Sequence, residues 1–379
     1  MEENEAITDE AQAREIADDR RALPRGPGMV GIQFTPRRVL WALAFVVLSI
    51  AFLYIVLPRL VGLRDTWNRI RHGDPWWFAF AAGLEVLSFL SYIALFRAVF
   101  VRSTSRISWR VSYQITMAGV AATRLLASAG AGGVAVTVWA LRRSGMGARV
   151  VASRMIAFMA LLYGVYMATL VVDGLGLYLG VFPGRAPFAI TIGPAIFGGV
   201  VILLVLGLSA MPWDVEAIVV RRTTDRTRSG RVMRRVAAAP AALTVGVKDA
   251  LALIRSRDPL LLAAVGWWAF DIAVLWACFH AFGSAPPQAV IVMAYFVGML
   301  GNVLPLPGGI GGVDGGMIGA FTAFGVNVEL SIVAVLAYRA FSFWIPTVPG
   351  AVAYFQLRRT IHRWRHAETS QPTGAPAPA

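Results

Sequence analysis

Long apolar stretches, separated by short polar segments, dominate the pattern of hydrophobic and polar positions along the chain. A helix needs about 20 mainly apolar residues to cross the hydrocarbon core of a bilayer. Six segments reach that length without interruption, and they predict six full transmembrane helices in an all-α, polytopic membrane protein. The six segments are residues 39–58, 75–101, 150–180, 188–211, 259–282 and 329–356.

Two further apolar stretches, residues 111–141 and 288–325, are each interrupted in the middle by glycines, joined in the second by two prolines. In hydrocarbon an unpaired backbone group is costly, so such a break persists at membrane depth only when it is buried in protein or faces water. We therefore expect two re-entrant or broken helical hairpins; an ordinary solvent loop between two helices is the alternative. The hairpin backbone positions are Gly130, Gly132 and Gly133 in the first stretch, and Pro305, Pro307, Gly308, Gly309, Gly311 and Gly312 in the second.

Basic residues indicate the orientation, because loops rich in lysine and arginine tend to stay in the cytoplasm. The segment 212–258 carries ten basic residues and is predicted to be a cytoplasmic loop. Counting spans from this loop places both ends of 111–141 inside and both ends of 288–325 outside. Both termini are then cytoplasmic, and the chain is expected in the plasma membrane as a multi-pass protein. Four arginines would face outside and oppose this assignment, namely Arg59, Arg64, Arg69 and Arg71.

This count of spans predicts two units with the same order of elements. In each unit two spans are followed by a broken hairpin and a further span. The units cover about residues 39–180 and 188–356 and point in opposite directions, which is the inverted-repeat plan of many transporters. The predicted transmembrane domain as a whole is 39–357. Residues 1–38 are predicted to be a disordered cytoplasmic tail, and residues 358–379 a basic and then disordered one.

Composition and charge narrow the class of protein. Hydrophobic residues make up 57% of the chain and charged residues only 15%, against ~25% charged residues in soluble domains. The net charge of +14 comes from segments beside the apolar stretches, so it indicates membrane orientation and contact with anionic lipids, not nucleic acid. The single cysteine, Cys278, gives no disulfide framework. Without a catalytic, cofactor or metal motif, we expect no enzyme, no cofactor and no metal.

Charged side chains inside the apolar segments form the candidate site, since a charge near the bilayer centre costs about 2.5–3.5 kcal/mol. Guanidinium groups match phosphate oxygens, while carboxylates at the same depth balance that charge or carry protons. Structural ion pairs between helices are the alternative reading. The predicted substrate pathway or polar cavity comprises Asp314, Arg339, Arg124, Arg154, Glu85, Asp271 and Asn302.

Two segments of the second half carry a family resemblance. Residues 304–314 read Leu-Pro-Leu-Pro-Gly-Gly-Ile-Gly-Gly-Val-Asp, and residues 336–346 read Leu-Ala-Tyr-Arg-Ala-Phe-Ser-Phe-Trp-Ile-Pro. Together they resemble the flippase-like membrane family related to the transmembrane region of lysylphosphatidylglycerol synthase, over about residues 39–357. Residues 129–142 look like an actinobacterial branch of that family.

The resemblance implies translocation of lipid between leaflets, with the broken hairpins near the path. Asp314 stands where the family commonly has glutamate, and residues 127–133 lack the proline and the Arg-Ala-Gly-Glu motif common in the family's first hairpin. This departure puts a proton or charge role for the first hairpin in doubt. The soluble aminoacyl-transfer domain of the full synthases has no counterpart after the last span, so lysyl transfer is not expected.

Three functions remain open from the sequence. The first is a transporter that moves an anionic lipid or lipid-linked precursor between leaflets, for which a groove open to lipid would speak. The second is a small-solute or ion transporter, which would have a cavity closed to lipid. The third is a non-transporting membrane subunit that partners an envelope-biosynthesis enzyme, with a solidly packed interior in which every charge is paired.

Overall fold

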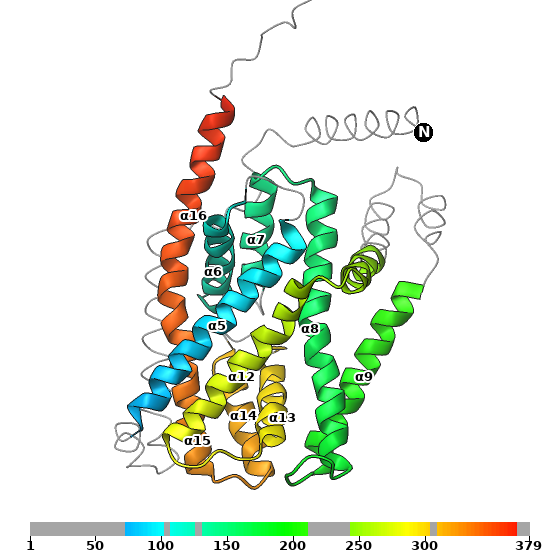
Figure 1. Ribbon diagram of the computed structural model, residues 1–379, viewed down its shortest axis with the longest axis vertical. Coiled ribbons are helices and arrows are strands. Elements are labelled where there is room, and N and C mark those ends of the chain that lie inside the picture. Colours follow the sequence, from blue (N-terminus) through cyan, green and yellow to red (C-terminus); the bar gives the residue numbers. More distant parts are fainter. Residues whose placement is uncertain (1–72, 102–106, 126–130, 211–242, 304–308, 370–379) are drawn as a thin grey trace, which may run out of the picture.

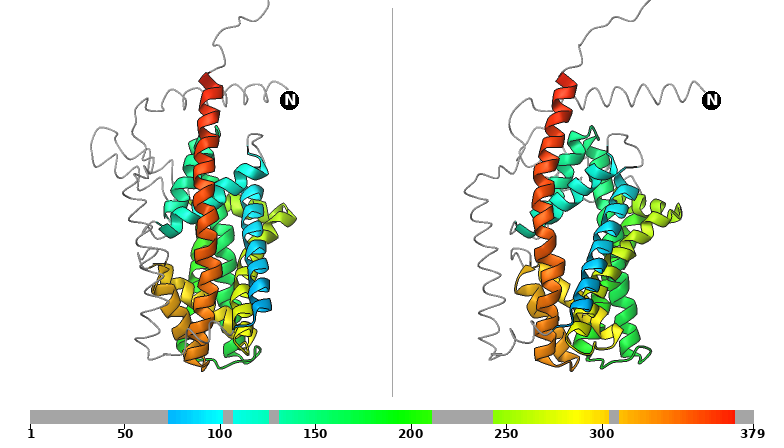
Figure 2. Two further views of the ribbon diagram at one scale, coloured as in Figure 1. Left: turned by 90° about the vertical axis from the view of Figure 1, so that its left-hand side faces the viewer. Right: turned by 60° about the vertical axis from the view of Figure 1, so that its left-hand side comes forward.

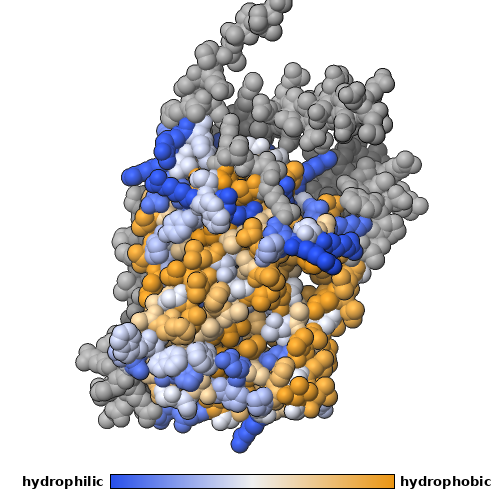
Figure 3. All heavy atoms as spheres, in the orientation of Figure 1, coloured by the Kyte–Doolittle hydropathy of each residue, from blue (hydrophilic) through white to orange (hydrophobic). Residues whose placement is uncertain are grey.

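The computed structural model describes residues 73–101, 107–125, 131–210, 243–303 and 309–369. All regular secondary structure in these ranges is helical, and the long helices form an elongated bundle (Figure 1 and Figure 2). On the face drawn in Figure 3, hydrophobic residues form a belt across the middle, and hydrophilic residues gather toward the two ends. The chain is an all-α, polytopic membrane protein.

Five helical segments of the described residues are long and apolar enough to cross a membrane, and they match five of the six predicted spans. The sixth, residues 39–58, lies outside the described residues. The five are α5 (Pro75–Phe100), α8 (Ala148–Tyr178), α9 (Phe188–Ala210), the pair η2 (Pro259–Leu262) and α12 (Ala263–Ala281), and the last span, which contains α15 (Val328–Arg339), η5 (Ala340–Trp344) and α16 (Ile345–Thr369).

The two interrupted stretches form helical hairpins. The first pairs α6 (Trp109–Leu125) with α7 (Ala131–Arg143), and the second pairs α13 (Gln288–Met299) and η3 (Leu300–Val303) with α14 (Gly312–Ala323). In Figure 1 the first hairpin lies toward the upper end of the molecule and the second toward the lower end. The turns at 126–130 and 304–308 lie outside the described residues.

Glycine lets the two arms of each hairpin touch through their backbones. A Cβ atom on Gly133 of α7 would lie 2.8 Å from the carbonyl oxygen of Gly119 in α6. In the second hairpin, a Cβ atom on Gly316 of α14 would lie 3.1 Å from the Cα atom of Gly298 in α13. Small residues permit such close approach of helices, so in both hairpins glycine allows the two arms to pack backbone against backbone.

The long helices α5 and α12 pack against each other in opposite directions at the centre of the bundle. The N–H of Asp74, before α5, donates to the carbonyl oxygen of Ala281 at the end of α12 (3.0 Å). Further along, the Ser88 hydroxyl donates to the carbonyl oxygen of Trp267 (3.0 Å). The two contacts are the same number of residues apart in both helices, and residue numbers rise along α5 where they fall along α12. This antiparallel pairing is the one expected of equivalent spans in two inverted units.

The last span is not one continuous α-helix. Its middle segment, η5, is a turn of π-helix, and Pro346 follows directly. Proline has no N–H to donate to the carbonyl four residues earlier, so the carbonyl oxygen of Ser342 loses its α-helical partner. π-Helical turns occur often at functional sites.

The halves of this last span pack against different neighbours. α15 packs against α12 and α14, which belong to the second unit. α16 packs against α6 of the first unit: a Cβ atom on Gly350 would lie 2.7 Å from the carbonyl oxygen of Met117, and the Thr360 hydroxyl donates to Oε1 of Gln114 (3.0 Å). The interface between the two units therefore passes through the last span.

Residues 243–255, inside the segment 212–258 expected to be a loop, are helical. They pack against the start of α8, where the Ser153 hydroxyl donates to the Asp249 carboxylate. The helix α16 likewise continues to Thr369, beyond the predicted domain end at residue 357. Residues 1–38 and 370–379 lie outside the described residues.

Candidate functional site

Two carboxyl groups meet where α5 and α12 pack together. Glu85 of α5 and Asp271 of α12 are each 6% exposed, and their side chains are hydrogen-bonded to each other. Glu85 leaves its Oε2 atom without a hydrogen-bond partner among the described residues. The structure thus brings together two of the predicted site residues, one from each unit.

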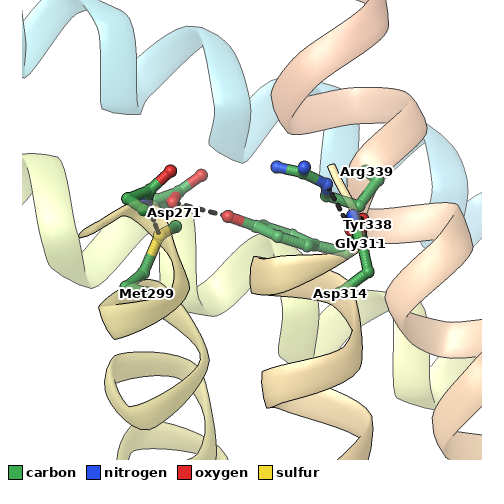
Figure 4. A network of polar contacts seen from close by, with 7 residues as sticks. Asp271, Met299, Gly311, Asp314, Tyr338 and Arg339 are labelled. Atoms are coloured by element: carbon green, nitrogen blue, oxygen red, sulfur yellow. Dashed lines mark hydrogen bonds and ion pairs between the residues drawn. The ribbon is translucent and has the colours of Figure 1, made fainter. Parts of the chain in front are cut away.

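Two tyrosines of the second unit donate hydrogen bonds to the Asp271 carboxyl group. Its Oδ2 atom accepts a hydrogen bond from the Tyr338 hydroxyl of α15 (2.9 Å) and another from the Tyr295 hydroxyl of α13. Figure 4 shows the Tyr338 ring reaching across to Asp271 while the next residue, Arg339, turns toward Asp314. Both tyrosine rings are almost fully buried, so these hydroxyls find their partner inside the protein.

Asp314 and Arg339 form a buried ion pair. Nε of Arg339 lies 2.5 Å from Oδ1 of Asp314, and the two side chains are 6% and 2% exposed, respectively. The other carboxylate oxygen of Asp314 accepts the backbone N–H of Gly311 (2.8 Å), so Asp314 also caps the first turn of α14, where negative charge is favoured (Figure 4). Gly311 has φ +83°, a conformation that glycine adopts without steric cost.

Arg124, in the last turn of α6, joins the first hairpin to the last span. Its guanidinium donates to the carbonyl oxygen of Phe343 (2.9 Å) and to that of Ser342, the carbonyl released by Pro346. The Phe343 ring lies between two cations, 5.3 Å from the Arg124 guanidinium carbon and 4.7 Å from that of Arg339. Arg124 also attracts the Glu85 and Asp271 carboxyl groups. Five predicted site residues therefore form one buried network.

Replacing Arg124 with lysine is expected to lower the free energy of unfolding by about 1.5–3 kcal/mol, because an ammonium group cannot reproduce the two parallel hydrogen bonds of a guanidinium fork. Thermal unfolding in detergent measures this loss. The control Arg149→Lys, at an exposed position near the start of α8, should change the free energy by less than about 0.5 kcal/mol. Equal melting temperatures for the two variants would contradict the bonds to Ser342 and Phe343.

An apolar groove runs beside this network. It has a volume of about 440 Å³ and is lined by α5, α8, α12 and α13. Leu84 and Ile272, the chain neighbours of Glu85 and Asp271, both lie on its wall, and Thr169 and Gln288 are its uncharged polar side chains. Such a lining suits a hydrocarbon chain, since apolar surface is favourably covered by apolar groups.

Other predicted site residues lie elsewhere. The prediction that Arg154 shares the cavity is not supported: its guanidinium donates to the carbonyl oxygen of Phe100 at the end of α5 (3.0 Å) and is attracted by Asp249. Its long side chain reaches to the end of the bundle because that is where carboxylate and backbone partners are found. Asn302 of η3 is exposed, and its amide donates to the Met299 sulfur (3.3 Å).

Of the predicted hairpin positions, Gly130, Pro305, Pro307 and Gly308 lie outside the described residues. Gly132 is buried in α7 next to Gly133, and Gly309 has φ +66° with the Asn302 side chain beside it. Gly312 begins α14 and its backbone lies against Gly301. These glycines act through close packing and backbone conformation.

Sequence reasoning missed three polar residues that the structure singles out. Tyr295 and Tyr338 read as apolar aromatic positions, although the Tyr-Arg pair at 338–339 was a visible signal. Asp173 of α8, 7% exposed, has an Oδ2 atom without a hydrogen-bond partner in the described part of the chain. Within the same described ranges, no group of His, Cys, Asp and Glu side chains is arranged to hold a metal ion.

Comparison with known proteins identifies the family. The model of the lysylphosphatidylglycerol synthase transmembrane region matches residues 39–350, which is most of the chain. The chain belongs to this family. The match spans every element described above as part of the site, from Glu85 on α5 to the π-helical turn after Arg339.

Curated relatives of this synthase transmembrane family are UPF0104 membrane proteins. One from Methanothermobacter thermautotrophicus is 26% identical over 320 residues, covering 78% of this chain and 90% of the relative. A second from that organism is 35% identical over 91 residues, which is 24% of this chain and only 26% of the relative. A third relative, from Methanocaldococcus jannaschii, is 30% identical over 95 residues, 25% of this chain and 28% of its own.

Proposed function

We propose that the chain translocates an anionic lipid, or a lipid-linked precursor, between the leaflets of the plasma membrane and catalyses no covalent reaction. The observation that carries this proposal is the apolar groove, on whose wall lie the chain neighbours of Glu85 and Asp271, two members of the network that also holds two guanidinium groups. An amphiphile needs both environments, one for its hydrocarbon chain and one for its head group. A transporter of small solutes or ions would not require an apolar groove.

Arg124 is the better ligand for a phosphate head group. Its present acceptors are the neutral carbonyl oxygens of Ser342 and Phe343, whereas Arg339 already faces the Asp314 carboxylate. Hydrogen bonds between charged partners are roughly twice as strong as neutral ones. A phosphate therefore displaces carbonyl oxygens from Arg124 with a gain, while Arg339 stays in its ion pair and shapes the site.

Binding of a head group at Arg124 would also loosen the contact between the first hairpin and the π-helical turn of the last span. The guanidinium joins α6 to η5, so loss of its carbonyl partners weakens this link, while α16 stays packed against α6. In this proposal the two hairpins are re-entrant segments of inverted units, and their rocking exposes Arg124 to alternate leaflets. The lipid favours one of the two conformations only to the extent that it binds that conformation more tightly than the other.

Basic side chains support the proposed orientation. Among the described residues, Arg142 and Arg143 end α7, Arg149 begins α8, and Arg358, Arg359 and Arg363 lie late in α16. All three element ends lie at the upper end of the molecule in Figure 1. By the positive-inside bias this end faces the cytoplasm, as do both termini.

The test is translocation of a fluorescent phosphatidylglycerol by the purified protein in vesicles, read as protection from a membrane-impermeant quencher. Ala273→Trp fills the groove and should slow translocation at least about fivefold by excluding the hydrocarbon chain. The control Val200→Trp adds the same bulk to α9 at a 49% exposed position and should keep the rate. Wild-type rates no higher than those of protein-free vesicles would overturn the proposal. Equal rates for the two variants would show that the groove is not part of the lipid path.

The non-transporting subunit remains the competing function. It requires a solidly packed interior, and the apolar groove of about 440 Å³ between α5, α8, α12 and α13 favours transport instead. A partner enzyme would be recognised by co-purification from membranes, with translocation absent in the vesicle assay.

A further inference from the structure

We propose that Glu85 and Asp271 form one proton-binding site, which couples the two inverted units to a proton gradient. The proposal deepens the transport function proposed above and depends on it for its coupling step. The occupancy of the site by a proton can be tested without transport. Glu85 is the group that carries the proton, and Asp271 is the group that retains the negative charge.

The two carboxyl groups contact each other where α5 packs against α12. Glu85 and Asp271 share a hydrogen bond inside the protein. An ionised carboxylate only accepts hydrogen bonds, whereas a protonated one also donates. Two carboxyl groups hydrogen-bonded to each other therefore hold at least one proton.

The surroundings of the two carboxyl groups differ. Oδ2 of Asp271 accepts hydroxyl hydrogen bonds from Tyr295 and Tyr338, which stabilise a carboxylate at that position. Oε2 of Glu85 has no partner among the described residues and is buried. A charge is far more costly to bury without partners than a neutral acid, so the proton resides on Glu85, which donates to Asp271.

The charges of the network balance when the pair holds one proton. Its buried acids are Glu85, Asp271 and Asp314, and its cations are Arg124 and Arg339. Asp314 and Arg339 neutralise each other, and Arg124 neutralises one carboxylate of the pair. One proton on the pair makes the whole network neutral, whereas its loss leaves a net negative charge where charge is most costly.

The groups around the pair come from five packed elements. Besides Asp271, α12 contributes Cys278, which lies within electrostatic range of Glu85; α6 contributes Arg124, and α13 contributes Tyr295. α15 contributes Tyr338 and Arg339. On α8 the buried Tyr166 hydroxyl donates to the carbonyl oxygen of Phe296 (2.5 Å) and so bonds to α13 instead of the pair.

The placement of the pair provides the coupling. Glu85 and its attracting cation Arg124 belong to the first unit, whereas Asp271 and both tyrosines belong to the second. Movement of one unit against the other separates Glu85 from Asp271 and changes the affinity for the proton. By linkage, a proton gradient then biases the movement.

The site itself is tested by infrared spectroscopy of the full chain in lipid vesicles at neutral pH, through the C=O stretch of protonated carboxyl groups. We expect such a band in the wild type and its loss in Glu85→Gln. The matched control and background is Asp173→Asn, which removes another buried carboxyl group with an unpartnered oxygen, one outside the network; the Glu85 band should persist there, and adding Glu85→Gln to that variant should remove it. A wild-type spectrum without the band, or a band that Glu85→Gln leaves intact, would overturn the proton site.

The coupling is tested with fluorescent phosphatidylglycerol in vesicles carrying an imposed pH gradient. The gradient should change the wild-type and Asp173→Asn rates several-fold and leave the Glu85→Gln rate unchanged, and Glu85→Asp should restore part of the effect. If the gradient does not change the wild-type translocation rate, the coupling is rejected and the transport function still holds. A protonated Glu85 band without any translocation rejects the transport function and leaves the proton site standing.

Discussion

Replacing Arg339 with methionine is expected to lower the free energy of unfolding by about 3–5 kcal/mol, the cost of removing one partner from a buried ion pair. The side chain is 6% exposed and its Nε atom lies 2.5 Å from the Asp314 carboxylate. Methionine fills much of the volume but leaves Asp314 charged, with Gly311 N–H as its remaining hydrogen-bond donor among the contacts described above. Chemical or thermal unfolding of the purified protein measures the loss.

The double variant Arg339→Met with Asp314→Asn serves as the control, because it removes both charges and lets the amide oxygen still accept the N–H of Gly311. It should recover more than half of the lost stability. The coupling between the two positions separates a true ion pair from two independent contributions. A single variant as stable as the wild type would show that the pair contributes nothing to the fold.

Replacing Gly301 with alanine is expected to cost about 1–3 kcal/mol or more, through overpacking of the second hairpin. A Cβ atom at this position would collide with the backbone carbonyl group of Gly312 and would lie 2.7 Å from the nitrogen of Val313. Backbone atoms cannot rotate away, so the arms of the hairpin must separate. The same measurement of unfolding reports the effect, and the separation should also reduce translocation.

Gly319 of α14 provides a matched control in the same hairpin, since a Cβ atom there would meet nothing within 4 Å. Alanine is favoured over glycine inside helices by about 0.5–1 kcal/mol, so Gly319→Ala should stabilise the protein. The two substitutions are chemically identical and have opposite expected signs. A loss of stability in both variants would mean that hairpin glycines matter through flexibility, not through close packing.

The positions of the long helices could be predicted from the sequence because span length follows directly from bilayer thickness. Five predicted spans agree with the structure within a few residues at most of their ends. The two interrupted stretches were also recognisable, since glycine runs such as 130–133 and 308–312 disrupt an apolar segment. These features depend on local composition, which a single sequence records.

The contacts of the site could be predicted only in part. A charge in a span predicts that a partner exists, but the choice of partner is a tertiary property. Arg154 and Arg339 both lie in the last predicted span of their unit, and of the two only Arg339 pairs with a carboxylate of a hairpin. The tyrosines on Asp271 were missed because a hydropathy pattern treats a buried tyrosine as one more apolar residue.

The division of the last span between two sets of neighbours makes the halves of the protein interdependent. A chain cut between α8 and α9 would give two fragments that each look complete by sequence. Yet α16, made by the second fragment, is the helix that covers α6 of the first through Gly350 and Thr360. The first fragment would expose a bare helix face, and neither fragment would fold as a complete half. A gene for this protein therefore cannot be split at the predicted repeat boundary unless both products are made together.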